Sequence, residues 1–400
     1  MDNPQSAPED KDGFAGGDPP LKGLKVLELA RVLAGPWAGQ VLADLGATVI
    51  KVESPDGDET RGWGPPFISR DGDTTAAYFY ACNRGKTSVA VDLKTAEGAA
   101  YVRELAADAD VLIENFKTGG LVPFGLDFAS VDAANPRIVY ASITGFGQDG
   151  PAAHRPGYDY LLQAMSGLMS ITGEPDRPPQ KVGVAITDLF TGLYAVVGIQ
   201  AALAERERSG KGQHIDLSLF DSATAMLANQ AMNYLASGTA PGRMGNAHPN
   251  IAPYQVFDVS DGACVIAVGN DGQFARLCEV LGLAHLSADT RFATNAARVA
   301  HAQALIHVLR GPLSSWHRDE LLAALESANV PASPINSVAE ALNHPQIKAR
   351  NMVIEPEDIA GLRTPLRFSR SELALGRSAP TKPGTTQGGL RVSVPRFERD

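Results

Sequence analysis

The stretch that decides the fold is KVLELARVLAGPWAGQVLADLGATVIKVE, residues 25–53. Its first six residues form an apolar run typical of a buried strand, and residues 48–53 form a second one. Between them, Pro36 suits the first position of a helix, and Gly46 ends the apolar pattern that follows it. A strand, a helix and a strand with such short connections predict parallel strands joined by a right-handed crossover.

The same alternation of strands and helices continues to about residue 235. It predicts a Rossmann-like, doubly wound parallel sheet with helices on both faces. The further strands are expected at 111–114, 137–143 and 214–219, and the further helices near 95–107, 158–169, 189–208 and 220–236.

The pattern changes at a loop rich in Gly, Pro and Asn, residues 238–253. Beyond it, Asp261-Gly262 separates two apolar runs, which predicts a β-hairpin of residues 254–259 and 264–269. Helical patterns then follow near 272–281, 295–310 and 318–328.

These patterns predict a large α/β domain over residues 21–237 and a smaller α+β domain over 238–330, which contains the Gly- and Asn-rich loop. Residues 331–378 are expected to return to the large domain, because Pro331 and Pro334 interrupt the helical pattern. Residues 1–20 are predicted to be a disordered tail, and residues 379–400 an extended or disordered one.

Composition excludes several functions. A net charge of −10 over 400 residues argues against a nucleic-acid partner, since phosphate backbones need a basic surface. Three widely spaced cysteines form neither a disulfide framework nor a metal site. No apolar run reaches the roughly 20 residues that span a bilayer, and the first residues do not resemble a signal peptide. We therefore expect a cytoplasmic protein with no membrane partner and no metal.

Asp188 is the leading candidate for chemistry. It lies where a Gly-broken apolar segment enters the long helix expected over 189–208. A carboxylate there faces the positive end of the helix dipole and unpaired N–H groups, so we expect it to be ionised at neutral pH and available as a nucleophile. The alternative is that Asp188 is only the N-cap, a position that Asp favours.

Other candidates lie at strand ends, where open α/β sheets bind ligands. The first turn lacks G-x-G-x-x-G, which argues against a nicotinamide cofactor, but Arg31 in it could hold a phosphate or carboxylate. Residues 83–86, Asn-Arg-Gly-Lys, could grip a phosphate or form a solvated turn. Asn115 and Phe116 could bind and stack on a base, and His248 is a lone histidine in a loop expected to be mobile.

Taken together, the motifs in residues 21 to about 367 resemble the class III CoA-transferases, the family of formyl-CoA and carnitine CoA-transferases. The order of the motifs makes the resemblance specific, although each is weak alone. The matching pieces are residues 34–36 (AGP), 45–53 (LGATVIKVE), 61–67 (RGWGPPF), 83–86 (NRGK), 114–116 (ENF), 142–148 (SITGFGQ), 157–159 (GYD), 166–169 (SGLM), 187–188 (TD) and 210–213 (GKGQ).

The resemblance implies that Asp188 is the nucleophile. It would form a mixed anhydride with the acyl group of an acyl-CoA, and then an aspartyl-CoA thioester that passes CoA to a carboxylic acid. CoA and acyl-CoA would be substrates, with no tightly bound cofactor. The positions that match the CoA-contacting motifs are Leu33, Asn83, Arg84, Asn115 and Phe116. Ser54, Thr144 and the C-terminal tail depart from the family pattern.

The motifs are most similar to those of the subgroup that acts on short dicarboxylates, with succinyl-CoA as the natural donor. The residues expected to bind the substrate are Arg31, Tyr158, Arg243, Gly245, Asn246 and His248. Arginine suits a second carboxylate because its guanidinium binds carboxylates in a bidentate way. The family also implies an interlocked homodimer.

Two alternatives stay open. The same superfamily contains α-methylacyl-CoA racemases, which use a histidine in a Gly-His-Asp motif as a base. Here Tyr158 takes that position, and a tyrosine with a pKa near 10 is a poor base at neutral pH, so a racemase is disfavoured. A non-catalytic CoA-binding protein would bind CoA without needing Asp188.

Overall fold

The computed structural model describes residues 16–383 and 395–397, which form two compact units. The larger unit contains residues up to 166, residues 182–228 and the chain from 346 onward. The smaller unit contains residues 167–181 and 229–345. The predicted boundaries after 237 and 330 therefore differ from the structure. The excursion at 167–181 was not predicted, because it depends on contacts with residues far along the chain.

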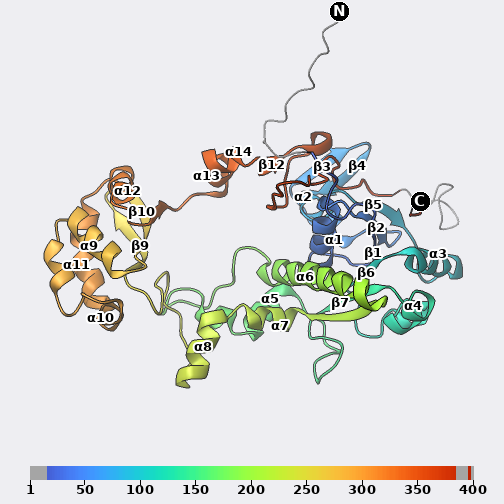
Figure 1. Ribbon diagram of the computed structural model, residues 1–400, viewed down its shortest axis with the longest axis horizontal. Coiled ribbons are helices and arrows are strands. Elements are labelled where there is room, and N and C mark those ends of the chain that lie inside the picture. Colours follow the sequence, from blue (N-terminus) through green and yellow to red (C-terminus); the bar gives the residue numbers. More distant parts are fainter. Residues whose placement is uncertain (1–15, 384–394, 398–400) are drawn as a thin grey trace, which may run out of the picture. The chain divides into compact units, whose positions relative to one another are not determined.

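The larger unit is built on a six-stranded parallel sheet in the order β5-β2-β1-β6-β7-β8 (Figure 1). The order of the strands along the chain reverses between β1 and β6, which places a ligand crevice at the carboxyl ends of the strands. The predicted doubly wound sheet is thus confirmed. The strands are β1 (Lys25–Glu28), β2 (Thr48–Glu53), β5 (Thr87–Ala90), β6 (Val111–Glu114), β7 (Val139–Thr144) and β8 (Gln213–Ser218).

Alternate residues of the strands face opposite layers of helices. Val26 and Ile113 belong to a core cluster with α1 (Ala34–Asp44) and α6 (Ile186–Ser209). Their neighbours Leu27 and Leu112 belong to a second cluster with α3 (Ala96–Asp108) and α4 (Phe128–Ala134). Both faces of the sheet are therefore buried, as the continuous apolar runs in β1 and β6 indicate.

Helix α6 packs closely against α1 at Gly192. A Cβ atom built on Gly192 would lie 2.6 Å from the carbonyl oxygen of Ala34, so a side chain there would push the helices apart. By length and composition alone, α6 could cross a membrane, and 44% of its most apolar window is buried inside the protein. Its packing on α1 makes it a core helix of the larger unit.

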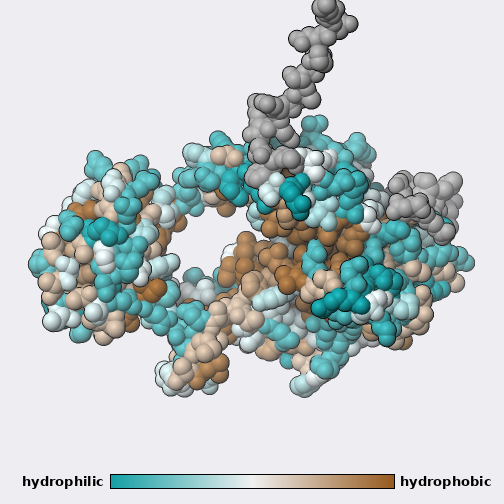
Figure 2. Space-filling view, viewed as in Figure 1, coloured by the Kyte–Doolittle hydropathy of each residue, from teal (hydrophilic) through white to brown (hydrophobic). Residues whose placement is uncertain are grey.

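The other side of α6 carries exposed apolar residues. Leu193, Tyr194 and Val197 are 47%, 44% and 62% exposed. Tyr160 and Leu161 of α5 (Asp159–Met165) are exposed as well. Figure 2 shows apolar surface at the position of α6. A contiguous exposed apolar face of this kind is typical of an interaction surface.

The smaller unit has its own core. The predicted hairpin forms as β9 (Tyr254–Val259) and β10 (Gly262–Ala267), and β11 (Ala332–Pro334) pairs with β10 to complete an antiparallel sheet. The helices predicted near 272–281 and 318–328 form as α9 (Asp271–Val280) and α12 (Arg318–Ser327). The one predicted near 295–310 forms as two helices, α10 (Asn295–Ala300) and α11 (Ala302–Ser314), and α13 (Val338–Asn343) was not predicted.

Shorter elements complete the larger unit. They are the hairpin β3 (Phe67–Arg70) and β4 (Asp73–Ala76), helix α2 (Ala77–Tyr80), helix α7 (Leu219–Ala225), helix α14 (Pro345–Ala349) and strands β12 (Val353–Ile354) and β13 (Gly361–Leu362). Helix α8 (Ala228–Ser237) begins at the boundary and has no buried residue.

The predicted tails are only partly described. Residues 1–15, 384–394 and 398–400 lie outside the described residues, so most of both tail predictions stays untested. Within the described part, Phe397 is 4% exposed and packs into the core cluster of α3, and the Tyr101 hydroxyl donates to the Pro395 carbonyl at 2.5 Å. Residues 395–397 therefore pack on the larger unit.

Candidate active site

Asp188 lies in the first turn of α6, as predicted, and its side chain is partly buried. Burial, and after it the nearby negative charge of Asp159, raises the pKa of Asp188 to about 7. We expected Asp188 to be ionised at neutral pH, but a pKa of about 7 leaves a comparable protonated fraction there, because desolvation disfavours the anion. A carboxyl with this pKa is poised between its two protonation states at physiological pH.

The predicted alternative, that Asp188 is the N-cap, is also corrected. The cap position is Ala185, which has no capping side chain. Instead, Asp159 at the start of α5 accepts a hydrogen bond from the Thr187 N–H at 2.8 Å and another from the Gln163 amide at 2.7 Å. The helix start is thus capped from a different element, and in the described part of the chain no hydrogen bond reaches the Asp188 carboxylate.

Tyr78 in α2 is a neighbour of Asp188 that sequence reasoning missed. Burial, and after it the charge of Asp188, raises the pKa of Tyr78 to about 12. Its hydroxyl therefore stays protonated at neutral pH and can donate a hydrogen bond. The Tyr78 ring packs edge-on against Trp63, with centroids 5.3 Å apart. Tyr78 is more than a hundred residues from Asp188 in sequence, and no motif in the chain linked them.

The turn after β1 is held by the end of β6. The Asn115 side chain accepts a hydrogen bond from the Arg31 N–H at 3.0 Å and donates one to the Arg31 carbonyl at 2.7 Å. The Arg31 guanidinium is exposed and lies 3.7 Å from the Glu59 carboxylate. Leu33, at the N-cap of α1, is buried. Asn115 therefore fixes the backbone of Arg31, the residue that the sequence analysis expected to bind a phosphate or carboxylate.

A cavity of about 610 Å³ opens at the carboxyl ends of β1 and β2. Arg31, Phe116 and Phe124 line it, together with the Lys94 segment after β5. It occupies the crevice expected where the strand order reverses. Of the predicted CoA residues, the structure places Phe116 on this cavity, and of the predicted substrate residues, Arg31. Phe124 and Lys94 were not predicted, since neither belongs to a recognisable motif.

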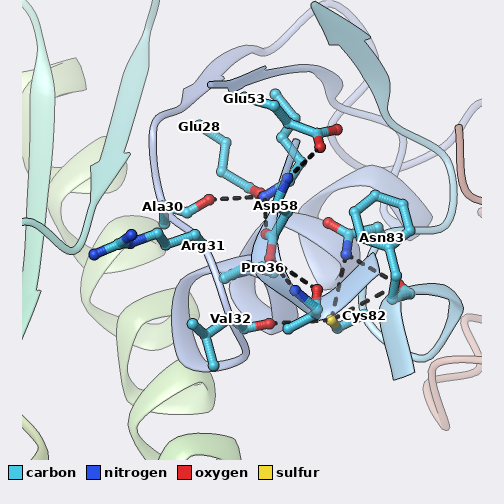
Figure 3. A network of polar contacts seen from close by, with 12 residues as sticks. Glu28, Ala30, Arg31, Val32, Pro36, Glu53, Asp58, Cys82 and Asn83 are labelled. Carbon is cyan, nitrogen blue, oxygen red and sulfur yellow. Dashed lines mark hydrogen bonds and ion pairs between the residues drawn. The ribbon is translucent and has the colours of Figure 1, made fainter. Parts of the chain in front are cut away.

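The segment 83–86 turns inward. Asn83 and Lys86 are fully buried, and Arg84 is 4% exposed, so a solvated turn is excluded. Arg84 forms a buried ion pair with Asp44 at 2.5 Å and also donates to the Leu362 carbonyl. Asn83 donates to the Phe79 carbonyl and accepts from Lys86 (Figure 3). Because these side chains already have internal partners, their predicted contact with CoA stays a prediction.

The predicted loop residues lie in the smaller unit. Arg243 donates from its guanidinium to the carbonyls of Glu174 and Pro175, at 3.0 and 3.2 Å. The Gly245 N–H donates to the Gly173 carbonyl at 3.0 Å, so this N–H already has a partner within the smaller unit. Gly245 has a φ of +60°, and a Cβ there would lie 2.6 Å from the Glu174 carboxylate. This part of the loop is therefore clasped to residues 173–175.

The remaining residues predicted to bind the substrate are His248, Asn246 and Tyr158. His248 accepts at Nδ1 from the Asn250 N–H at 3.0 Å, and its ring lies 5.2 Å from that of Tyr254. Asn246 is exposed in the same loop, and Tyr158 is 63% exposed just before α5. Their roles toward a substrate stay predictions.

Comparison with known proteins identifies the family of the chain. The model of a family described as CoA-transferase family III matches residues 21–385. The chain is 54% identical over 389 residues to the succinate–glutarate CoA-transferase of Agrobacterium fabrum, covering 95% of this chain and 97% of that protein. It is 45% identical over 337 residues to the succinyl-CoA:glutarate CoA-transferase of Mus musculus, covering 84% and 76%.

A solved structure has the same fold. A crystal structure of a CaiB/BaiF family protein from Brucella suis is 60% identical and superposes with a TM-score of 0.83, covering 92% of this chain and 97% of that one. The chain therefore belongs to CoA-transferase family III and is a CoA-transferase.

Proposed function

We propose that the enzyme transfers CoA from succinyl-CoA or a similar donor to a short carboxylic or dicarboxylic acid such as glutarate, with Asp188 as the nucleophile. The names of the two relatives, both matched over most of their length, support this choice of substrates. The observation that carries the catalytic role is the unpaired, partly buried carboxyl of Asp188, whose pKa is about 7.

The proposed chemistry conserves the energy of the thioester. The Asp188 carboxylate attacks the thioester carbonyl, a C–O bond forms, the C–S bond breaks, and CoA leaves as the thiolate. The thiolate then attacks the Asp188 carbonyl and releases the donor acid, which leaves an aspartyl-CoA thioester. The acceptor carboxylate then attacks the Asp188 carbonyl and displaces the CoA thiolate, which forms a new anhydride. The thiolate attacks the acyl carbonyl of this anhydride, the C–O bond breaks, and the new acyl-CoA and the free Asp188 carboxylate are released. Covalent catalysis thus divides one difficult transfer into easier steps.

The surroundings of Asp188 suit these steps. Nucleophilic attack requires the ionised carboxylate, and a pKa near 7 supplies an ionised fraction at neutral pH while leaving the carboxylate poorly solvated. The protonated Tyr78 hydroxyl is a donor close to the same charge. We assign the cavity at Arg31 and Phe116 to part of the CoA molecule, with the aromatic rings available for stacking and Arg31 and Lys94 available for phosphate.

A matrix of CoA donors against free acids tests the proposal. We expect transfer from succinyl-CoA to glutarate, capture of an acyl-enzyme by hydroxylamine, and no transfer by Asp188→Ala. Asp221→Ala is the matched control, since Asp221 holds the equivalent position in the first turn of α7 and is exposed. Exchange of the α-hydrogen of a 2-methylacyl-CoA without transfer would favour the racemase. CoA binding unaffected by Asp188→Ala, with no transfer by the unaltered protein, would favour a binding protein.

We also propose that the enzyme is a homodimer in which the exposed apolar face of α5 and α6 is covered by the second copy. Support comes from the resemblance to the family and from Leu193, Tyr194 and Val197, which expose large apolar surfaces on one side of α6. Light scattering should give twice the mass of the chain. Val197→Lys should weaken the dimer, and a monomeric mass for the unaltered protein would contradict the proposal.

A further inference from the structure

The turn between β1 and α1 contains a strained residue. Val32 has a φ of +70°, in the left-handed region that glycine favours. For a β-branched residue this conformation is a genuine outlier and persists only when the surroundings enforce it. Contacts from other parts of the chain therefore hold the turn in this shape.

Two buried lysines hold the two ends of the turn. Lys51 Nζ donates to the Ala30 carbonyl at 2.7 Å, and Lys86 Nζ donates to the Pro36 carbonyl at 2.8 Å. Both ammonium groups meet at the carboxylate of Glu28, at 3.1 Å from Lys51 and 2.8 Å from Lys86. All three charged side chains are fully buried.

The middle of the turn is held as well. The Cys82 thiol donates to the Val32 carbonyl at 3.6 Å (Figure 3), and the Asn115 amide clasps both backbone groups of Arg31. The carbonyls of residues 30, 31, 32 and 36 thus all accept from side chains of other elements. This set of contacts determines the position of the turn much more fully than its own local preferences do.

The turn lies between the cavity and the helix of Asp188. Ala30 and Arg31 line the cavity. The Ala34 carbonyl packs on Gly192 of α6, one helical turn after Asp188. A shift of the turn would therefore change the cavity wall and the start of α6 together.

The buried charges are not explained by stability alone. A buried ion pair gives little net stability compared with apolar side chains of similar volume, because both ions lose their hydration. Asp58 pairs with Lys51 at 3.0 Å, so the cluster of Glu28, Asp58, Lys51 and Lys86 is neutral overall. The two lysines donate directional hydrogen bonds to carbonyls of the turn. They therefore restrict the conformation of the turn.

We propose that Lys51 and Lys86, joined through Glu28, are positioning residues for CoA transfer, and that they act by holding the strained Val32 turn between the cavity and Asp188. This inference rests on the proposed function, because the reaction is its readout. It predicts that loosening the network impairs catalysis through the turn and not through a general loss of folding.

The test uses Lys86→Met, which keeps the apolar volume and removes the donors. At a temperature where every variant is folded, kcat/KM for the acyl-CoA should fall by about tenfold or more, since a displacement of about 1 Å can reduce a rate by up to about a hundredfold. Adding Val32→Gly should restore much of the loss, because glycine adopts a positive φ without strain.

Arg206→Met is the control. Arg206 is 6% exposed and pairs with Asp110 at 3.0 Å, just before β6 and so at the opposite end of that strand from the turn. Its loss should lower the melting temperature but leave kcat/KM unchanged. If Lys86→Met does not fold, Cys82→Ala removes a weaker contact to the same turn and should show a smaller loss with the same rescue.

Three results would overturn the inference. They are a wild-type kcat/KM for the folded network variant, an equal loss in Arg206→Met, and the absence of any rescue by Val32→Gly. Failure of the unaltered enzyme to transfer CoA would instead contradict the proposed function, so the two failures are distinguishable.

Discussion

Two carboxyl groups of the larger unit, the fully buried Glu28 and the partly buried Asp188, differ in their partners. Glu28 at the end of β1 lies between the ammonium groups of Lys51 and Lys86. Asp188 at the start of α6 has no cation beside it within the described residues, and its charged neighbour is Asp159. The paired carboxylate orients two lysines that bind backbone carbonyls, whereas the unpaired one is destabilised as an anion. The first arrangement suits a structural role, and the second suits the nucleophile that we propose.

The largest effect is expected for Asp188→Asn. Transfer should fall by at least about a thousandfold, because the amide is no nucleophile. Stability should rise, because the raised pKa of Asp188 means that the folded state disfavours the anion which the unfolded chain carries above pH 4. The gain should be small near pH 4, grow as the pH rises to about 7 and then level off. Initial rates and urea unfolding at pH 5 and 8 measure both effects.

A smaller stability at pH 8 for Asp188→Asn than for the unaltered enzyme would contradict the raised pKa. Asp221→Asn supplies the comparison, since it should change neither the rates nor the pH dependence of unfolding.

Removal of a paired charge should have the opposite effect on stability. Lys51→Met leaves the carboxylate of Asp58 without its ammonium partner and should lower the free energy of unfolding by about 3–5 kcal/mol. Urea denaturation measures the change. Lys25→Met is the matched case, because Lys25 pairs with Asp108 at the surface, and it should lose less than about 1 kcal/mol. Equal losses in the two variants would show that burial of the network is irrelevant.

The charge of Asp159 can be removed while its cap is kept. In Asp159→Asn the side-chain oxygen can still accept from the Thr187 N–H, but the negative charge that raises the pKa of Asp188 is gone. The pKa of Asp188 should fall, so the rise of kcat/KM with pH should move to a midpoint below that of the unaltered enzyme. A profile measured from pH 5 to 9 tests this, and an upward movement would refute it.

The smallest effect is expected at the cavity. Phe116→Ala should raise KM for the acyl-CoA by about fivefold or more with little change in kcat, since loss of one stacking ring weakens binding by about 1–3 kcal/mol. Val122→Ala, an exposed apolar residue near Phe124 that does not line the cavity, should leave KM unchanged. A change in kcat alone would show that Phe116 lies near the reacting atoms and not at a binding surface.

The order of strands and helices followed from the sequence because it depends on local periodicity. Residues 25–53 carry two apolar runs and a helix with clear ends, and these appear as β1, α1 and β2. The hairpin around Asp261-Gly262 followed from a turn signal of two residues. The position of Asp188 in the first turn of α6 was predictable for the same reason. Domain boundaries were not, since residues 167–181 join the smaller unit through contacts distant in sequence.

By itself, the sequence determined the parallel sheet, the helix that carries Asp188 and, through its motifs, the family. Only the tertiary structure decided the pKa of the Asp188 carboxyl and the burial of the side chains of Asn83, Arg84 and Lys86. The physical reason is that both depend on desolvation and on partners from separate elements. Asp159 reaches α6 from α5, and Lys51 and Lys86 reach Glu28 from the segments around β2 and β5. The residue pattern of one segment does not show which side chains of other segments will contact it.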